Sequence, residues 1–137
     1  MTQLNRTGER SGERAPFQAL RVLVIEDNAI VGMLVADLLA EIGHVVCAIE
    51  VTQEGAVAAA VRCKPELMIV DARLAGGSGL SAVDEILRHG FIPHVFVSGD
   101  TASILTAKPD AIVLQKPFRD PDLADAIRRA LGNAGPS

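Results

Sequence analysis

The sequence predicts a doubly wound α/β domain with a five-stranded parallel sheet. Short apolar runs alternate with segments of helical character, the connecting loops are short, and polar residues follow each run. Continuous apolar runs are typical of strands that are covered on both faces, as in parallel sheets. The expected strands are residues 22–25, 45–49, 67–70, 93–97 and 111–114.

The helices expected between these strands have recognisable ends. Asn28 is suited to cap a helix that Gly43 ends, and the expected buried stripe of this helix consists of Ile30, Leu34, Leu38 and Ile42. Pro65 closes an Ala-rich helix over 52–62, and Gly132 ends a last helix that the Asp120-Pro121 pair begins. The remaining helices are expected over 80–89 and, as a short segment, over 101–108.

Composition excludes several classes of function. The chain of 137 residues has a net charge of -4, no Trp or Tyr and no large Lys/Arg cluster, so we expect no binding to nucleic acid. No apolar run approaches the roughly 20 residues that span a bilayer, and the polar N-terminus lacks the apolar segment of a signal peptide. We therefore predict a cytoplasmic protein without membrane contact, with a disordered tail over 1–18, one folded domain over 19–133 and a frayed end over 134–137.

Chemically active residues follow four of the five expected strands. Glu26 and Asp27 follow the first strand, Asp71 the third, Ser98 the fourth and Lys116 the fifth. In a doubly wound sheet these positions meet at one edge. Polar residues often follow strands simply because chains turn in water there, but three acids in one crevice repel each other, and Mg²⁺ relieves that repulsion. With an ammonium and a hydroxyl beside them, the set favours acceptance of a phosphoryl group on Asp71.

Segments at the strand ends resemble those of one known family. The sequence from Arg21 to about Leu131 resembles the receiver domains of response regulators, which have a flavodoxin-like (βα)5 fold. The matching segments are Val22-Leu-Val-Ile-Glu26-Asp27, Met68-Ile-Val-Asp71, Val95-Phe-Val-Ser98-Gly99 and Gln115-Lys116-Pro117-Phe118, and Gly79 matches the family's loop.

The resemblance implies a role for each matching position. Asp71 is expected to be the phosphoacceptor, with Ser98 and Lys116 contacting the phosphoryl oxygens. Mg²⁺ is expected to be bound by Asp27, by Asp71, by the backbone carbonyl of Arg73 and, through water, by Glu26. The bond between Lys116 and Pro117 is expected to be cis.

The resemblance also implies partners. Because few residues follow the last expected helix, we expect a single-domain receiver of a two-component system that is not an enzyme, apart from possible self-catalysed dephosphorylation. It would take its phosphoryl group from a sensor histidine kinase or a histidine phosphotransfer protein and signal by contact with an unknown downstream protein. Two alternatives stay open: a pseudo-receiver that binds partners without phosphorylation, and a small phosphatase with an Asp nucleophile. Arg73 argues against the phosphatase, which needs an acid at that position.

Three departures from the family pattern concern how a signal would be relayed. Ala75 stands where many receivers have Pro, in a loop of small residues that we expect to be mobile. Val113 replaces the usual aromatic switch residue, and a short stretch before Lys116 leaves room for only a stunted fourth helix. Arg73 and Asp100 lie at the expected rim of the site, either as an ion pair that slows hydrolysis or as two independently solvated side chains.

Overall fold

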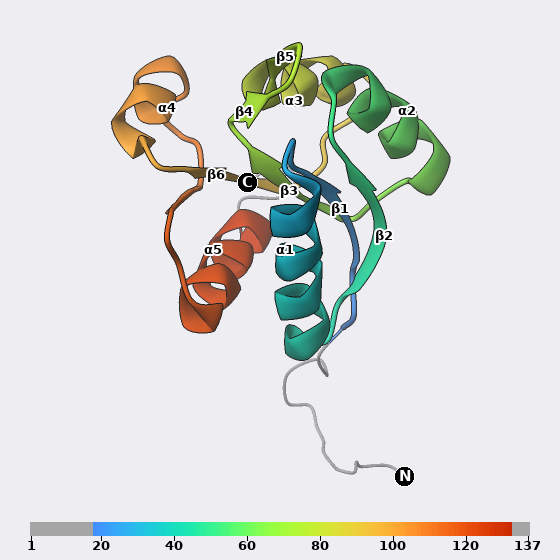
Figure 1. Ribbon diagram of the computed structural model, residues 1–137, viewed down its shortest axis with the longest axis vertical. Coiled ribbons are helices and arrows are strands. Elements are labelled where there is room, and N and C mark those ends of the chain that lie inside the picture. Colours follow the sequence, from blue (N-terminus) through green and yellow to red (C-terminus); the bar gives the residue numbers. More distant parts are fainter. Residues whose placement is uncertain (1–17, 133–137) are drawn as a thin grey trace, which may run out of the picture.

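A computed structural model describes residues 18–132 of the protein. The predicted tail, apart from Gln18, and the predicted frayed end lie outside the described residues. Figure 1 shows a central sheet with helices on both of its faces. Among residues 18–132, no helix is both long enough and apolar enough to cross a bilayer.

The main sheet has five parallel strands in the order β2-β1-β3-β6-β7. This is the flavodoxin-like order, so the predicted fold class is confirmed. All five residues of the central strand β3 are buried, as expected for a strand covered on both faces. The strands are β1 (Arg21–Ile25), β2 (Val45–Glu50), β3 (Leu67–Asp71), β6 (His94–Ser98) and β7 (Val113–Gln115).

Helices cover the two faces of the sheet unequally. Two helices pack on one face and three on the other, so the sheet separates two apolar cores (Figure 1). The first face carries α1 (Ala29–Ile42) and α5 (Asp120–Gly132). The second face carries α2 (Gln53–Cys63), α3 (Gly79–Leu87) and the short α4 (Thr101–Ala107).

The buried stripe predicted for α1 is wrong in its first half, whereas Leu38 and Ile42 are partly buried and pack against the core as predicted. Ile30 and Leu34 are 71% and 57% exposed, and the helix instead buries Gly32, Val35 and Leu39. A Cβ atom on Gly32 would lie 2.8 Å from a methyl group of Ile49, so the face that contains glycine is the one that fits closely against the sheet. Because α1 is apolar on more than one face, the helical period alone did not identify the buried one.

Several element boundaries also differ from the prediction. β7 begins at Val113, two residues later than expected, and the small-residue loop after β3 contains two short strands, β4 (Arg73–Leu74) and β5 (Gly77–Ser78), which pair antiparallel. The short fourth helix and the cis bond between Lys116 and Pro117 are both found as predicted.

Candidate functional site

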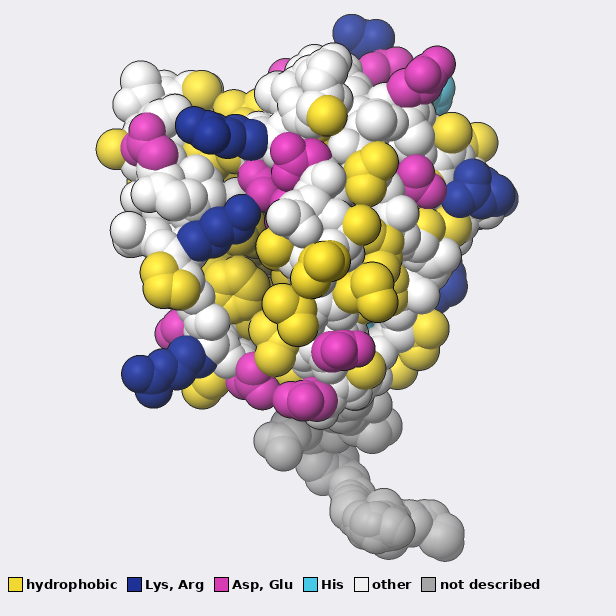
Figure 2. Space-filling model, viewed as in Figure 1, with side chains coloured by type: hydrophobic (Ala, Val, Ile, Leu, Met, Phe, Trp, Pro, Cys, Tyr) yellow, Lys and Arg dark blue, Asp and Glu magenta, His cyan; other side chains and the backbone are white. Residues whose placement is uncertain are grey.

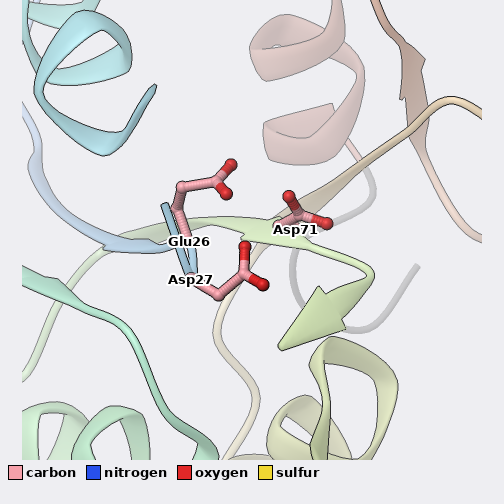
Figure 3. A group of neighbouring side chains, drawn as sticks. All are labelled: Glu26, Asp27 and Asp71. Atoms are coloured by element: carbon pink, nitrogen blue, oxygen red, sulfur yellow. The ribbon is translucent and has the colours of Figure 1, made fainter. Parts of the chain in front are cut away.

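Three carboxylates converge at the carboxyl end of the central strands. Glu26 and Asp27 follow β1, and Asp71 is the last residue of the adjacent strand β3 (Figure 3). One carboxylate oxygen from each residue lies within 4.8 Å of the others. Glu26 and Asp71 are buried, whereas Asp27 is exposed, so the cluster opens to solvent on the Asp27 side.

One ammonium group lies against these acids. The Nζ atom of Lys116 is 2.8 Å from Oδ2 of Asp71 and 3.8 Å from Oε1 of Glu26. Burial lowers the pKa of Lys116, but the hydrogen bond and charge of Asp71, with the charges of the other acids, outweigh it and raise the pKa overall. The ammonium is therefore retained beside the carboxylates.

The acids outnumber the cation that faces them. The pKa of Glu26 is raised to about 7, mainly by burial and also by the neighbouring Asp71, against a hydrogen bond from the backbone of Asn28 and the charge of Lys116. A cluster of oxygen ligands with uncompensated negative charge is the donor set that Mg²⁺ prefers. The residues present therefore fit a divalent cation.

Both oxygens of Asp71 are held in place. Oδ1 accepts a hydrogen bond from the backbone N–H of Arg73 at 2.8 Å, and Oδ2 accepts one from Lys116. The side chain of Arg73 is exposed, as expected for a residue that would contribute its backbone to the site. The carboxylate is thus oriented by one backbone amide and one cation.

Ser98 lies at the same edge of the sheet, but its hydroxyl faces its own loop. Oγ accepts a hydrogen bond from the N–H of Asp100 at 2.9 Å, and the carbonyl of Ser98 accepts one from the N–H of Lys116. Asp100 caps α4 by accepting a hydrogen bond from Ser103. Among residues 18–132, no ion pair joins Arg73 to Asp100, so the charged gate considered from the sequence is not formed in this structure.

Two contributors to the site were not predicted. The backbone N–H of Asn28 donates to Oε2 of Glu26 at 3.1 Å, and Gln53 contacts the loop that follows Asp71. Asn28 was expected only as a helix cap, a role that it also has. Gln53 begins an Ala-rich helix, and nothing in the neighbouring sequence indicates that its side chain reaches a loop more than twenty residues away.

Comparison with known proteins gives consistent matches. The response regulator receiver domain family matches residues 22–128. The chain is 33% identical over 127 residues to the phyllosphere-induced regulator PhyR of Methylorubrum extorquens, covering 90% of this chain and 48% of that protein. It is 32% identical over 115 residues to the transcriptional regulatory protein PdtaR of Mycobacterium tuberculosis, covering 81% of this chain and 56% of that protein.

Solved structures agree. The receiver domain of PhyR from Erythrobacter litoralis superimposes with a TM-score of 0.78 at 31% identity, covering 87% of this chain and 95% of that one. The anti-anti-sigma factor PhyR from Bartonella quintana gives a TM-score of 0.75 at 32% identity, covering 85% of this chain and 49% of that one. The chain thus spans about half the length of the curated relatives it matches. It belongs to the response regulator receiver domain family, the signal-accepting domains of two-component regulators.

Proposed function

We propose that the protein accepts a phosphoryl group on Asp71 from a phosphohistidine of a sensor histidine kinase or phosphotransfer protein. The observation that carries this proposal is the buried Asp71 carboxylate, which lies 2.8 Å from the Lys116 ammonium and within a cluster of three acids. In the transfer, a carboxylate oxygen of Asp71 forms a bond to phosphorus while the phosphorus–nitrogen bond breaks, and the imidazole leaves with that electron pair.

Each neighbour of Asp71 has a distinct part in this proposal. Asp27, Asp71, the carbonyl of Arg73 and, through water, Glu26 would hold Mg²⁺, which when bound neutralises charge on the incoming phosphoryl group. Lys116 moves from its contact with Asp71 to a phosphoryl oxygen, because that oxygen carries more negative charge than the modified carboxylate. Ser98 donates its hydroxyl to a second oxygen. The domain belongs to a family of signalling proteins that are generally not enzymes.

The surface beside the site favours a protein as the donor of the phosphoryl group. Ile30, Met33 and Leu34 of α1 are 71%, 60% and 57% exposed, and Figure 2 shows an apolar patch on this face of the molecule. A cavity of about 480 Å³, lined largely by apolar side chains, reaches from Leu34 and Phe118 to Asp71 and Lys116. An apolar surface that leads to a reactive carboxylate is suited to a helical partner, which would cover it and exclude water.

The partner surface can be separated from the chemistry by using two phosphoryl donors. We expect Leu34→Glu to slow transfer from a phosphorylated histidine protein by about tenfold or more, since a buried charge opposes docking. Transfer from acetyl phosphate, which needs no docking surface, should stay within about twofold of wild type, as should both reactions for the control variant Val45→Glu on the exposed part of β2. Equal loss with both donors would contradict this assignment of the surface.

The output of the domain is proposed to be contact with a downstream protein in the cytoplasm. By family resemblance, that contact involves α4, β7 and α5, where the short α4 buries only Ile104 among its seven residues. The sequence prediction that Val113 excludes an aromatic switch remains part of this proposal, and signalling would rely instead on movement of the Ser98 loop.

The experiment that tests the proposed function is intact mass after incubation with acetyl phosphate and Mg²⁺. We expect a gain of one phosphoryl group in the wild type and none in Asp71→Asn, which keeps the shape of the side chain but removes its nucleophilic charge. Chelation of Mg²⁺ should remove the adduct. A wild type that gains no phosphoryl group, even with a phosphorylated histidine protein supplied, would favour the pseudo-receiver alternative.

A further inference from the structure

The loop that follows Asp71 forms hydrogen bonds both with Asp71 and with the N-terminal end of α2. Its two short strands pair with Arg73 opposite Ser78, and its tip forms a parallel bridge between Ala75 and Thr52. The loop is therefore a small hairpin, which we call the β4–β5 hairpin (residues 73–78). It lies against the N-terminal end of α2.

Gln53, the first residue of α2, supplies the side-chain contacts that hold this hairpin. Its Oε1 atom accepts a hydrogen bond from the N–H of Ser78 at 3.4 Å. Its Nε2 atom donates to Oγ of Ser81 at 2.9 Å and to Oε1 of Glu85 at 3.3 Å, both on α3. One amide group thus joins the hairpin, α2 and α3.

Glycines allow the chain to pass closely between Gln53 and Asp71. A Cβ atom on Gly77 would lie 2.5 Å from Oε1 of Gln53, and one on Gly79 would lie 2.0 Å from the backbone oxygen of Asp71. A side chain at position 79 would push the backbone away from Asp71, and one at position 77 would displace the amide end of Gln53. The small residues that predict a mobile loop therefore permit close packing here.

We propose that Gln53 is a positioning residue for the metal site. Its contacts within residues 18–132 are with the hairpin and α3, so it acts through Arg73, which begins the hairpin. The N–H of Arg73 orients Asp71, and its carbonyl is a Mg²⁺ ligand in the proposed function, on which this inference rests. By holding the other strand of the hairpin at Ser78, Gln53 keeps both backbone groups of Arg73 in place before the metal binds.

The first test compares Mg²⁺ affinity in wild type, Gln53→Ala and the matched control Gln18→Ala, whose side chain is exposed and outside the site. We expect Gln53→Ala to bind Mg²⁺ about threefold to tenfold more weakly, as the loss of one to two hydrogen bonds predicts. Hydrogen exchange of the Arg73 and Ser78 amides, measured by NMR without metal, should become faster in the same variant. Gln18→Ala should match wild type in both measurements.

A second variant separates positioning from general stability. The double variant Gln53→Glu with Glu85→Gln keeps the net charge, keeps an acceptor for Ser78 and reverses the hydrogen bond between the two side chains. We expect it to restore Mg²⁺ affinity to within about twofold of wild type. If Gln53 only stabilised the fold, thermal stability would fall in Gln53→Ala while Mg²⁺ affinity stayed the same.

The outcomes distinguish this inference from the proposed function. Wild-type protein that does not bind Mg²⁺ at millimolar concentration would overturn the proposed function together with the inference. If wild type binds Mg²⁺ and Gln53→Ala changes neither the Mg²⁺ affinity nor the hydrogen exchange of the Arg73 amide, the inference about Gln53 is overturned while the proposed function stands.

Discussion

Two loops flank the carboxylate of Asp71, and they are built in opposite ways. The β4–β5 hairpin follows β3 and leads directly into Gly79, the first residue of α3, where a Cβ atom would lie 2.0 Å from the backbone oxygen of Asp71, so glycine is needed there. The loop after β6 is open: a Cβ atom on Gly99 would have no neighbour within 4 Å. The helix after the open loop, α4, has seven residues and buries only Ile104.

In the proposed function, this difference corresponds to two tasks of the site. The hairpin holds the backbone groups that orient Asp71, which must be in place before the reaction because a metal site depends on preset ligand geometry. The open loop carries Ser98, whose hydroxyl now accepts a hydrogen bond from Asp100 and would have to turn to donate to a phosphoryl oxygen. We therefore infer that the rigid β4–β5 hairpin keeps the metal ligands in place, while the open loop after β6 moves when Asp71 is phosphorylated.

The largest expected effect comes from adding one methyl group at Gly79, directly after the hairpin, and one at Gly99, in the loop after β6. Gly79→Ala should lower the free energy of unfolding by about 3 kcal/mol, because its Cβ would lie 2.0 Å from the backbone oxygen of Asp71. Gly99→Ala should change it by less than about 0.5 kcal/mol. Urea unfolding of both variants measures the contrast, and similar losses would show that the two loops are equally packed.

The next largest effect is the loss of stability when the N-cap side chain at the end of each loop is removed. Ser78 caps α3 by accepting from the N–H of Ser81, and Asp100 caps α4 by accepting from the N–H of Ser103. Each change to Ala should cost about 1 kcal/mol. For Ser78→Ala we expect the loss in global unfolding, whereas for Asp100→Ala we expect faster hydrogen exchange confined to α4. Global destabilisation by Asp100→Ala would mean that α4 unfolds together with the core.

The smallest effect is a pH dependence at the start of β6, the strand that leads to Ser98. Burial, with the charge of Lys108, lowers the pKa of His94 below 6.5, against the hydrogen bond to the backbone oxygen of Ile92 and the charge of Asp84. The folded protein therefore keeps His94 neutral at a pH where the unfolded chain is protonated. Its contribution to stability is complete above about pH 6.5 and is lost as the pH falls through the lower folded pKa.

His94→Phe removes this titration while keeping a ring beside Phe96, which the histidine contacts edge-on. Between about pH 7.5 and 5.5 the free energy of unfolding should fall more steeply in wild type than in the variant, by at most about 1.4 kcal/mol per pH unit for one proton. Urea unfolding at several pH values measures both slopes. Parallel curves would show that His94 does not titrate differently in the folded state.

The sequence was sufficient to predict the fold class and the four side chains that gather at the sheet edge, those of Glu26, Asp27, Asp71 and Lys116. Ser98 lies at the same edge, with its hydroxyl turned to its own loop. Strand ends are marked by abrupt changes from apolar runs to charged residues, and the topology of a doubly wound sheet brings those ends together. The prediction of Asp71 beside Lys116 follows from this rule, and the structure brings the two within 2.8 Å.

What the sequence did not predict depends on packing between distant elements. The first half of the buried face of α1 was misassigned because Ile30 and Leu34 are as apolar as the residues that are buried, and the close approach of Gly32 to Ile49 lies on the face that packs on the sheet. The role of Gln53 was missed for a similar reason, since its partners lie on a loop and a helix far along the chain. Contacts of this kind have no local signal in the sequence.

The most direct test of the account is an NMR comparison of the protein with Mg²⁺ alone and with Mg²⁺ and beryllofluoride, an analogue of the phosphoryl group. We predict large changes in amide shifts at residues 98–101 and at Lys116, with small changes at residues 76–79, because the hairpin is preset and the open loop responds. Asp71→Asn should show none of these changes. No change in the wild type, or changes confined to the hairpin, would contradict the account.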